Sequence, residues 1–324
     1  MKTPRTDNPA NSAGEPVPWS PAGGHGVAVP WHALLATDGS AASAGAVAFA
    51  AALVRLRGAT VRAVTVLDSS AYPYPYPGAG FEPSAADTEV LADGLDGRRA
   101  HDTVLRQLSE LIGDQVAATA TFPCGRTVPT IVREAEESGA SMIVLGLNRH
   151  DLIDRLAGEE TALRVARTAP IPVLAVAPAL GHLPRRIVVA VDFSPASVRA
   201  AQQVYTLAGD GARIVLAHVQ PPVSERDHND ENAHYALGVG GALARLAATM
   251  PTTAAVITET VALEGDPVEQ LHQLAAKTDC ELIALGSHRH SFVGRLMLGS
   301  VTTELIRAAE FSVFIAPPSE RQAT

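Results

Sequence analysis

The sequence of 324 residues predicts an α/β protein made of two tandem, doubly wound parallel sheets with five strands each. Three observations lead to this fold class. Short continuous apolar runs alternate with Ala-rich amphipathic stretches, which is typical of parallel strands covered on both faces. The same succession of runs occurs twice along the chain. The length also suits two domains, at roughly 100 to 200 residues per domain.

The repeated elements define two domains, at residues 30–179 and 185–318, preceded by a tail at 1–29 that is rich in Pro, Gly, Ser and Asn and is predicted to be disordered. Each domain is predicted to run strand, helix, strand, and later a fourth and a fifth strand. The matching segments are His32–Ser40 with Arg186–Ser194, 41–57 with 196–209, Thr60–Leu67 with Arg213–Val219, Ser141–Gly146 with Glu281–Gly286, and Ile171–Ala177 with Phe311–Ala316. Ser40 and Ser194 are expected to cap the following helices or to hold the turns before them.

The two copies differ in length between the first and fourth strands. Asp38 and Asp192 are 154 positions apart, whereas Gly146 and Gly286 are 140 apart, so the first copy carries 14 additional residues. The Tyr-Pro stretch at 71–83 is the predicted insertion, because its prolines forbid a helix. A plain long loop and a partner-binding segment of the polyproline type both stay open.

Composition narrows the class of protein. Hydrophobic residues make up 47% and charged residues 18%, which argues against a wholly disordered chain. The net charge of −9 excludes a global basic surface for nucleic acid or an anionic membrane. The N-terminal residues lack the apolar core of a signal peptide, and the run Ala41–Val54 is too short to span a bilayer, so we expect a soluble, cytoplasmic protein. Cys124 and Cys280 are predicted to be reduced thiols, although one bridge between them is conceivable.

Polar residues and glycines converge at the predicted strand ends of the second domain. Asp192 ends its first strand, and Gly286 ends its fourth. Gly299 and Ser300 come directly before a helical stretch. A Gly–Ser pair at a helix start presents unpaired N–H groups, a hydroxyl and the positive end of the helix dipole to an anion. Ligands of open α/β sheets bind at this edge, so the pattern predicts a phosphate site.

The stretch GSHRHSFVGRLMLGSVTTELI, together with the acidic residue that ends the first strand, resembles the universal stress protein family over nearly all of residues 32–318. Members of that family, which share an α/β fold of the HUP type, bind ATP through a motif of Gly, two residues, Gly, nine residues, Gly and Ser or Thr. Gly286, Gly299 and Ser300 match its first glycine, third glycine and hydroxyl. The middle glycine is Arg289 here, and this side chain either obstructs phosphate or grips it.

The resemblance implies that the second domain binds ATP, and whether Mg²⁺ accompanies it stays open. The implied contacts are Asp192 and Val219 for adenine and ribose, Gly286, Ser287, His288 and Arg289 for the phosphate approach, and Gly299, Ser300 and Val301 for the phosphates. In the first domain Glu159 and Glu160 stand where Gly299 and Ser300 stand in the second, with Gly158 displaced by one position. Two carboxylates repel a polyphosphate, so the first site is predicted to be degenerate.

The resemblance implies a nucleotide-linked regulator of the stress response with an unknown protein partner. Two alternatives stay open: a scaffold that has lost nucleotide in both domains, and a slow ATPase or autophosphorylating protein with Ser300 as acceptor. Motifs of established catalytic classes are missing, so no catalytic residue is assigned. His288 and His290 are read as solvated loop residues rather than metal ligands, His218 as packed or site-lining, and Cys124 as an inert thiol.

The fifth strand of each domain is expected at an edge of its sheet, and exposed apolar edges need cover. In the universal stress protein family that this sequence resembles, two copies of a single-domain member pair through their fifth strands across a two-fold axis. The resemblance therefore implies that the two domains form an intrachain pseudo-dimer, with Val173 near Val313. The whole chain is then a monomer, or a homodimer through the Tyr-Pro loop or helical faces.

Overall fold

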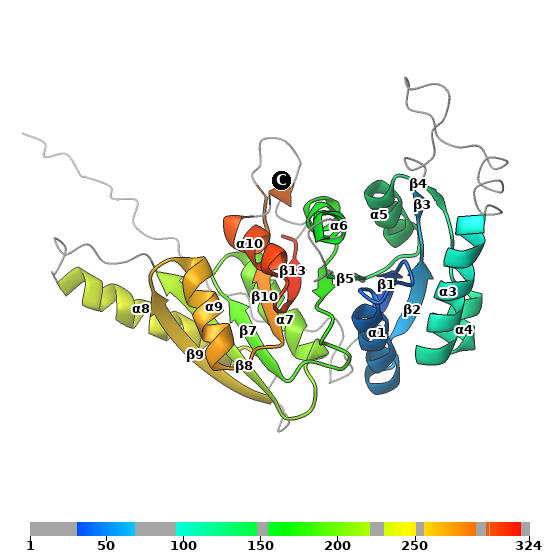
Figure 1. Cartoon of the computed structure of the whole chain (residues 1–324). Coiled ribbons are helices and arrows are strands. Elements are labelled where there is room, and N and C mark those ends of the chain that lie inside the picture. Colours follow the sequence, from blue (N-terminus) through cyan, green and yellow to red (C-terminus); the bar gives the residue numbers. More distant parts are fainter. Residues whose placement is uncertain are drawn as a thin grey trace, which may run out of the picture.

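The computed structural model describes residues 31–68, 95–147, 155–220, 230–250, 256–289, 296–297 and 299–318 (Figure 1). The predicted N-terminal tail and the Tyr-Pro insertion lie outside these residues. No helix in the described ranges is both long and apolar enough to cross a membrane.

Nine strands form one continuous sheet in the order β2-β1-β5-β6-β13-β10-β7-β8-β9. The first half supplies β1 (His32–Ala36), β2 (Thr60–Val64), β5 (Met142–Gly146) and β6 (Val173–Val176). The second half supplies β7 (Arg186–Ala190), β8 (Ala212–Gln220), β9 (Val256–Glu264), β10 (Leu282–Gly286) and β13 (Ser312–Ala316). Neighbours within each half are parallel, as the continuous apolar runs predict.

The first half differs from the expected five strands because its third strand is reduced to a fragment. The two-residue β4 (Cys124–Gly125) pairs in parallel with β3 (Leu67–Asp68), outside the main sheet. Pro123, directly before β4, has no N–H to donate to a ladder, although its carbonyl accepts a bond from the Leu67 N–H at 2.9 Å. The second half carries the full nine-residue β9 at this position.

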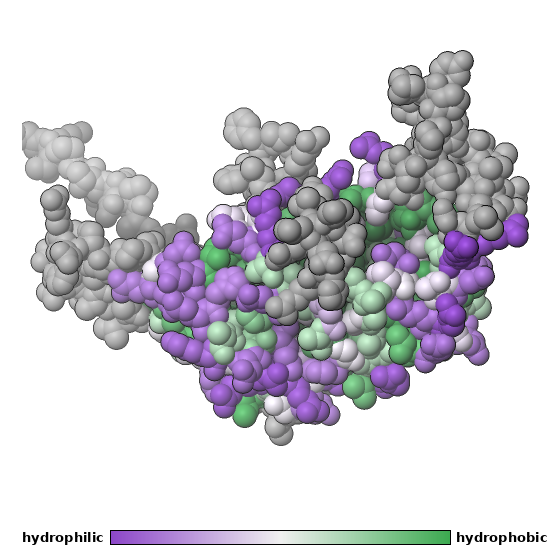
Figure 2. All heavy atoms as spheres, viewed as in Figure 1, coloured by the Kyte–Doolittle hydropathy of each residue, from purple (hydrophilic) through white to green (hydrophobic). Residues whose placement is uncertain are grey.

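Helices cover both faces of the sheet, as a doubly wound fold requires. One face holds α1 (Ala44–Arg57), α3 (Leu95–Leu111), α7 (Pro195–Leu207) and α8 (Asp230–Ala248), and the other holds α5 (Thr127–Glu137), α6 (Arg155–Thr168), α9 (Pro267–Lys277) and α10 (Ser300–Ala308). The short α4 (Asp114–Ala118) follows α3. Each face has its own apolar core that runs through both halves, so the two copies share their interior. In Figure 2 the described surface over α9 is mostly hydrophilic, which agrees with the burial of its apolar side chains in the core.

The two halves join through their fifth strands. β6 pairs antiparallel with β13, and Leu174 lies opposite Phe314, its equivalent in the repeat. Val173 lies opposite Ile315, the equivalent of Ala175, and Ala175 lies opposite Val313. This register is symmetric about the Leu174–Phe314 pair, which is the pattern of a pseudo-two-fold axis. The prediction that the fifth strands meet between the halves is confirmed.

The two serines predicted as caps have different roles. Ser194 is the N-cap of α7, and its Oγ accepts a bond from the Ser197 N–H at 3.2 Å. Ser40 holds a turn instead, with its Oγ 3.3 Å from the Ser43 N–H, and α1 begins only at Ala44. Both residues therefore act within the two possibilities that the sequence predicts.

Both cysteines are free thiols, as expected. Burial raises the pKa of Cys124 and raises that of Cys280 to about 12. A raised pKa opposes formation of the reactive thiolate, so the interpretation of Cys124 as an inert thiol is supported.

Candidate functional site

The candidate site of the second half begins at the turn that follows β7. Asp192 is exposed, and its Oδ1 accepts a bond from the Ser194 N–H at 2.9 Å. The Asp192 N–H lies 3.4 Å from Ser197 Oγ in the first turn of α7. The strand end is thus tied to the helix start, and the carboxylate is held in place at the carboxyl edge of the sheet.

Phe193, in the middle of this turn, is a residue that the sequence reasoning missed. Its φ of 60° lies in the left-handed region, where a bulky side chain is strained. The ring centroids of Phe193 and His218 are 5.0 Å apart, and 37% of Phe193 is exposed. His218 is itself fixed, because its Nδ1–H donates to the Val191 carbonyl at 2.7 Å. The ends of β7 and β8 therefore carry an aromatic pair with one partly open member.

His218 was predicted to be packed or site-lining, and its contacts with Val191 and Phe193 show that it is packed. Val219 is half-buried at the next position of β8 and packs against the core on the α9 and α10 side. Asp192, Val219 and Gly286 come from the carboxyl ends of β7, β8 and β10, which are neighbours in the order β10-β7-β8. This is the point at which the strand order reverses, where open α/β sheets bind ligands.

Gly286 is required for packing in addition to any role toward phosphate. A Cβ at this position would lie 2.4 Å from the Ser197 nitrogen and 2.5 Å from the Ala196 carbonyl carbon, at the start of α7. Gly146 in the first half faces the same restriction, with a Cβ 2.8 Å from the Ala42 oxygen. Close approach of the helix start to the strand end therefore explains why both copies keep this glycine.

Ser287 lies with its side chain turned inward. The residue is buried, its N–H donates to the Ala316 carbonyl at 2.9 Å, and its Oγ lies 3.4 Å from the same oxygen. These bonds tie the end of β10 to the end of β13. Its hydroxyl is engaged in this link rather than presented at the surface.

Gly299 and Ser300 begin α10, as the sequence predicts for a phosphate cradle. Gly299 is the exposed N-cap, with a φ of −62° and no side-chain hydrogen bond to the helix. A Cβ there would meet no atom of the described residues within 4 Å, so neither backbone strain nor packing against them requires glycine at this place. Ser300 is exposed, and Val301 is half-buried and packs against the same core as Val219. Within the described ranges no side chain caps the start of α10, and its first N–H groups are suited to an external acceptor.

The connection between β10 and α10 contains β11 (His288–Arg289) and β12 (Leu296–Met297). They pair antiparallel, with His288 opposite Met297 and Arg289 opposite Leu296. The side chains of His288 and Arg289, and all of His290, lie outside the described part of the chain. Whether Arg289 obstructs or grips phosphate therefore stays a prediction.

The first half builds the same edge differently. Gly39 occupies the position of Phe193 with a φ of 73°, and a Cβ there would lie 2.9 Å from Val104 Cγ2 and 3.2 Å from Thr103 Cγ2 of α3. The turn is thus covered by α3. Further along, α6 begins at Arg155, so positions 158–160 lie inside the helix rather than at its start. Positions 159 and 160, which correspond to Gly299 and Ser300 in the second half, therefore do not begin their helix.

Among the described residues, no group of three or more His, Cys, Asp or Glu side chains is arranged to hold a metal ion. The site of the second half instead combines a carboxylate, an aromatic pair and an open helix start. These groups suit the recognition of a ribose or base at one end and an anion at the other.

Comparisons with known proteins agree with this fold. A family model described as the universal stress protein family matches residues 32–177 and 184–317. A universal stress protein of Mycobacterium tuberculosis is 26% identical over 314 residues, which cover 91% of this chain and 98% of the relative. A universal stress protein structure from Archaeoglobus fulgidus has a TM-score of 0.61 at 18% identity, covering 89% of this chain and 98% of that one. A protein from Pseudomonas aeruginosa described as functionally unknown has a TM-score of 0.60 at 14% identity, covering 89% and 93%. At these identities the two structures indicate the fold alone.

Proposed function

The chain belongs to the universal stress protein family, with two copies of the family's domain in tandem, and from this premise we propose that it binds ATP in its second half. The proposed contacts are Asp192 and Val219 near the base and ribose, Gly286, His288 and Arg289 along the approach, and Gly299, Ser300 and Val301 at the phosphates. The buried Ser287 is proposed to hold the approach in place through its bonds to Ala316. Phe193 joins this set as a neighbour of Asp192 at the end of β7.

The observation that carries the proposal is the uncapped start of α10. Ser, Thr, Asp and Asn are preferred at this position, because their side chains accept a first-turn N–H. Gly299 leaves those donors open, although the space and the backbone conformation would accept a side chain. The positive end of a helix dipole, which these open N–H groups form, stabilises a nearby negative charge by about 0.3–2 kcal/mol.

The first half is proposed to bind no nucleotide. The turn at Gly39 is covered by α3, and positions 158–160 continue a helix that has already begun. Neither arrangement offers the open helix start found at Gly299. One ATP per chain follows, and we propose that its occupancy reports on cellular nucleotide to a protein partner during stress.

Calorimetric titration with ATP, with and without Mg²⁺, tests the proposal. We expect saturable binding with a stoichiometry near one. The double substitution Gly299→Glu with Ser300→Ala should abolish ATP binding, because it adds a carboxylate to the helix start and removes the hydroxyl there. Gly240→Glu is the matched control, since it adds the same charge to an exposed position of α8 where a Cβ meets no atom within 4 Å.

Four outcomes contradict the proposal. Absence of ATP binding in the unaltered protein favours a nucleotide-free scaffold. A stoichiometry near two places a second site in the first half. Release of ADP and free phosphate favours an ATPase instead of a binding protein. Phosphate attached to Ser300, detected by mass spectrometry, favours an autophosphorylating protein.

A further inference from the structure

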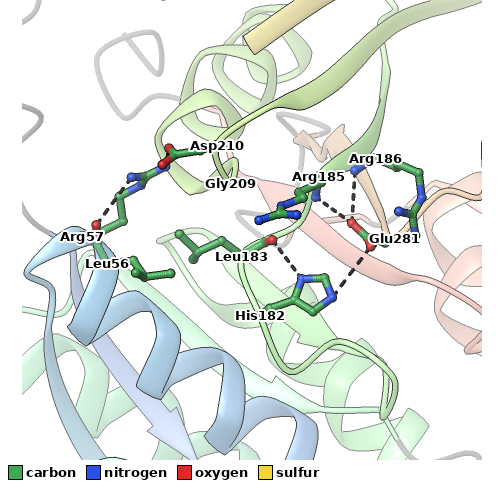
Figure 3. Close-up of a pocket in the computed structure, with 9 residues that line it drawn as sticks. All are labelled: Leu56, Arg57, His182, Leu183, Arg185, Arg186, Gly209, Asp210 and Glu281. Atoms are coloured by element: carbon green, nitrogen blue, oxygen red, sulfur yellow. Dashed lines mark hydrogen bonds and ion pairs between the residues drawn. The ribbon is translucent and has the colours of Figure 1, made fainter. Parts of the chain in front are cut away.

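A hollow of about 540 Å³ lies at the amino-terminal ends of the strands, away from the proposed ATP site (Figure 3). Its walls come from three parts of the chain: the end of α1 in the first half, the linker between β6 and β7 (residues 177–185), and the turns before β8 and β10 in the second half. A site here is therefore complete only when both halves and the linker are in place. The volume falls within the range of about 300–1,000 Å³ usual for small-molecule sites.

Arg185, at the end of the linker, places an unused guanidinium in this hollow. Its main-chain N–H donates to Glu281 Oε2 at 2.6 Å, which fixes the backbone. Its Cγ lies 3.2 Å from the point where a Cβ on Gly209 would stand, so this glycine leaves room for the side-chain stem. The guanidinium has no hydrogen-bond or ion-pair partner within the described part of the chain, and it points into the hollow toward the end of α1 (Figure 3).

Arg57 faces Arg185 from the first half. Its Nη2 donates to the Ala208 carbonyl at the end of α7 and lies 3.7 Å from Asp210 Oδ1. The Asp210 side chain is 85% exposed, so water screens this ion pair strongly. Arg57 Nη1 also lies 3.5 Å from the Leu56 carbonyl, so two backbone carbonyls hold this guanidinium at the edge of the hollow.

The second carboxylate of the hollow is already neutralised. Glu281 has only 14% of its side chain exposed, and it pairs with Arg186 Nη2 at 2.8 Å. It also accepts the main-chain N–H groups of Arg185 and Arg186, at 2.6 and 3.1 Å. His182 Nε2 lies 3.8 Å from the same carboxylate. Three arginines therefore face two carboxylates, and the one that is buried has its own donors, which leaves an excess of positive charge at Arg185.

We infer that this hollow binds a small organic anion, with a carboxylate or phosphate group held by the planar fork of Arg185 and by Arg57. Arginine suits both groups because its parallel N–H donors match two oxygens. Leu56, which is 60% exposed, and the buried Leu183 provide an apolar wall for the body of the ligand. Since the ligand would touch both halves, its binding stabilises their mutual arrangement by linkage.

Calorimetric titration of the full chain with inorganic phosphate, citrate and chloride, at one ionic strength, tests this inference. We expect saturable binding of phosphate or citrate but not chloride, and the anion that binds identifies the group. Arg185→Ala should weaken binding at least about tenfold, the loss expected for a charged hydrogen bond. Arg185→Lys keeps the charge but removes the fork, so it should recover only part of the affinity. Arg245→Ala, an exposed arginine of α8, is the control for charge alone and should bind like the unaltered protein.

The double variant Gly299→Glu with Ser300→Ala distinguishes the hollow from the proposed ATP site. It should bind the same anion with unchanged affinity. Loss of anion binding in that variant, with normal binding in Arg185→Ala, overturns the inference and leaves the proposed ATP site standing. Absence of saturable binding for phosphate and for citrate in the unaltered protein also overturns it. Neither result depends on whether ATP binds.

Discussion

The turn after the first strand is built from the same backbone in both halves but faces different surroundings. In the first half Gly39 has a φ of 73° and lies beneath α3. In the second half Phe193 has a φ of 60°, is partly exposed, and contacts His218. Glycine adopts this conformation freely, whereas phenylalanine pays roughly 1–2 kcal/mol of strain. The second half thus has a residue with a strained backbone at the carboxyl edge of the sheet, where the open start of α10 also lies.

The strand-end glycines, unlike the turn residues, are the same in both halves. Gly146 and Gly286 meet the same restriction, each from the start of the first helix of its own half, although only the second half has the open helix start of α10. Their presence therefore indicates the fold and cannot by itself indicate a ligand. The positions at which the halves differ, 39 with 193 and the starts of α6 and α10, carry the information about function.

The largest effect is expected from Gly286→Ala. The new Cβ would clash with the backbone of α7 at 2.4 Å, so we expect a loss of about 3 kcal/mol in the free energy of unfolding. Gly146→Ala should cost less, about 2 kcal/mol, because its nearest atom is at 2.8 Å. Urea unfolding followed by circular dichroism measures both. Gly240→Ala, in an exposed helical position with open space, should instead stabilise by up to about 1 kcal/mol. A neutral Gly286→Ala would mean that α7 can withdraw from the strand end.

The next effect sharpens the assignment of the second half as the nucleotide site. If Arg289 grips phosphate, Arg289→Ala should weaken ATP binding by about 1.5–3 kcal/mol, the size of a charged hydrogen bond. If it obstructs, Arg289→Gly should tighten binding. Calorimetry on both variants decides between these readings. Equal affinity in both would show that the side chain faces solvent.

Phe193 tests whether the strained turn serves the ligand. Phe193→Leu keeps the apolar volume but loses the aromatic face, and we expect ATP affinity to fall by about 1–2 kcal/mol if the ring stacks on the base. Binding of tripolyphosphate, which lacks a base, should not change. Phe193→Gly should relieve the backbone strain and raise the free energy of unfolding. It should weaken ATP binding as much as Phe193→Leu does. If Phe193→Leu binds ATP like the unaltered protein, the ring serves only to pack against His218.

The order of strands and helices was predictable because apolar periodicity reports burial, and both faces of this sheet are buried. The reduced third strand of the first half was not predictable, because the matching apolar runs assign no residues to a third strand. The missing N–H of Pro123 weakens a ladder at this place.

At the site, Gly299 and Ser300 followed from the pattern, because a helix start has a local signature. The inward side chain of Ser287 and the left-handed Phe193 did not, because each depends on contacts with residues distant in sequence. The hollow around Arg185 was hidden for the same reason. It joins α1, the linker and the start of β10, which no local pattern connects.

The smallest expected effect compares the two cysteines. Burial raises the pKa of Cys280 to about 12 from 9.0, so the folded state keeps a proton that the unfolded chain releases above pH 9. Stability from this group is fully present below pH 9 and is lost as the pH rises toward 12. At pH 10 the loss is about 1 kcal/mol, and Cys280→Ala should flatten the fall in the free energy of unfolding between pH 9 and 10.5. Cys124→Ala should flatten it less, because the Cys124 thiol is only half-buried. Urea unfolding at a series of pH values measures both, and equal slopes in the two variants would show that the buried thiol of the second half does not set this pH dependence.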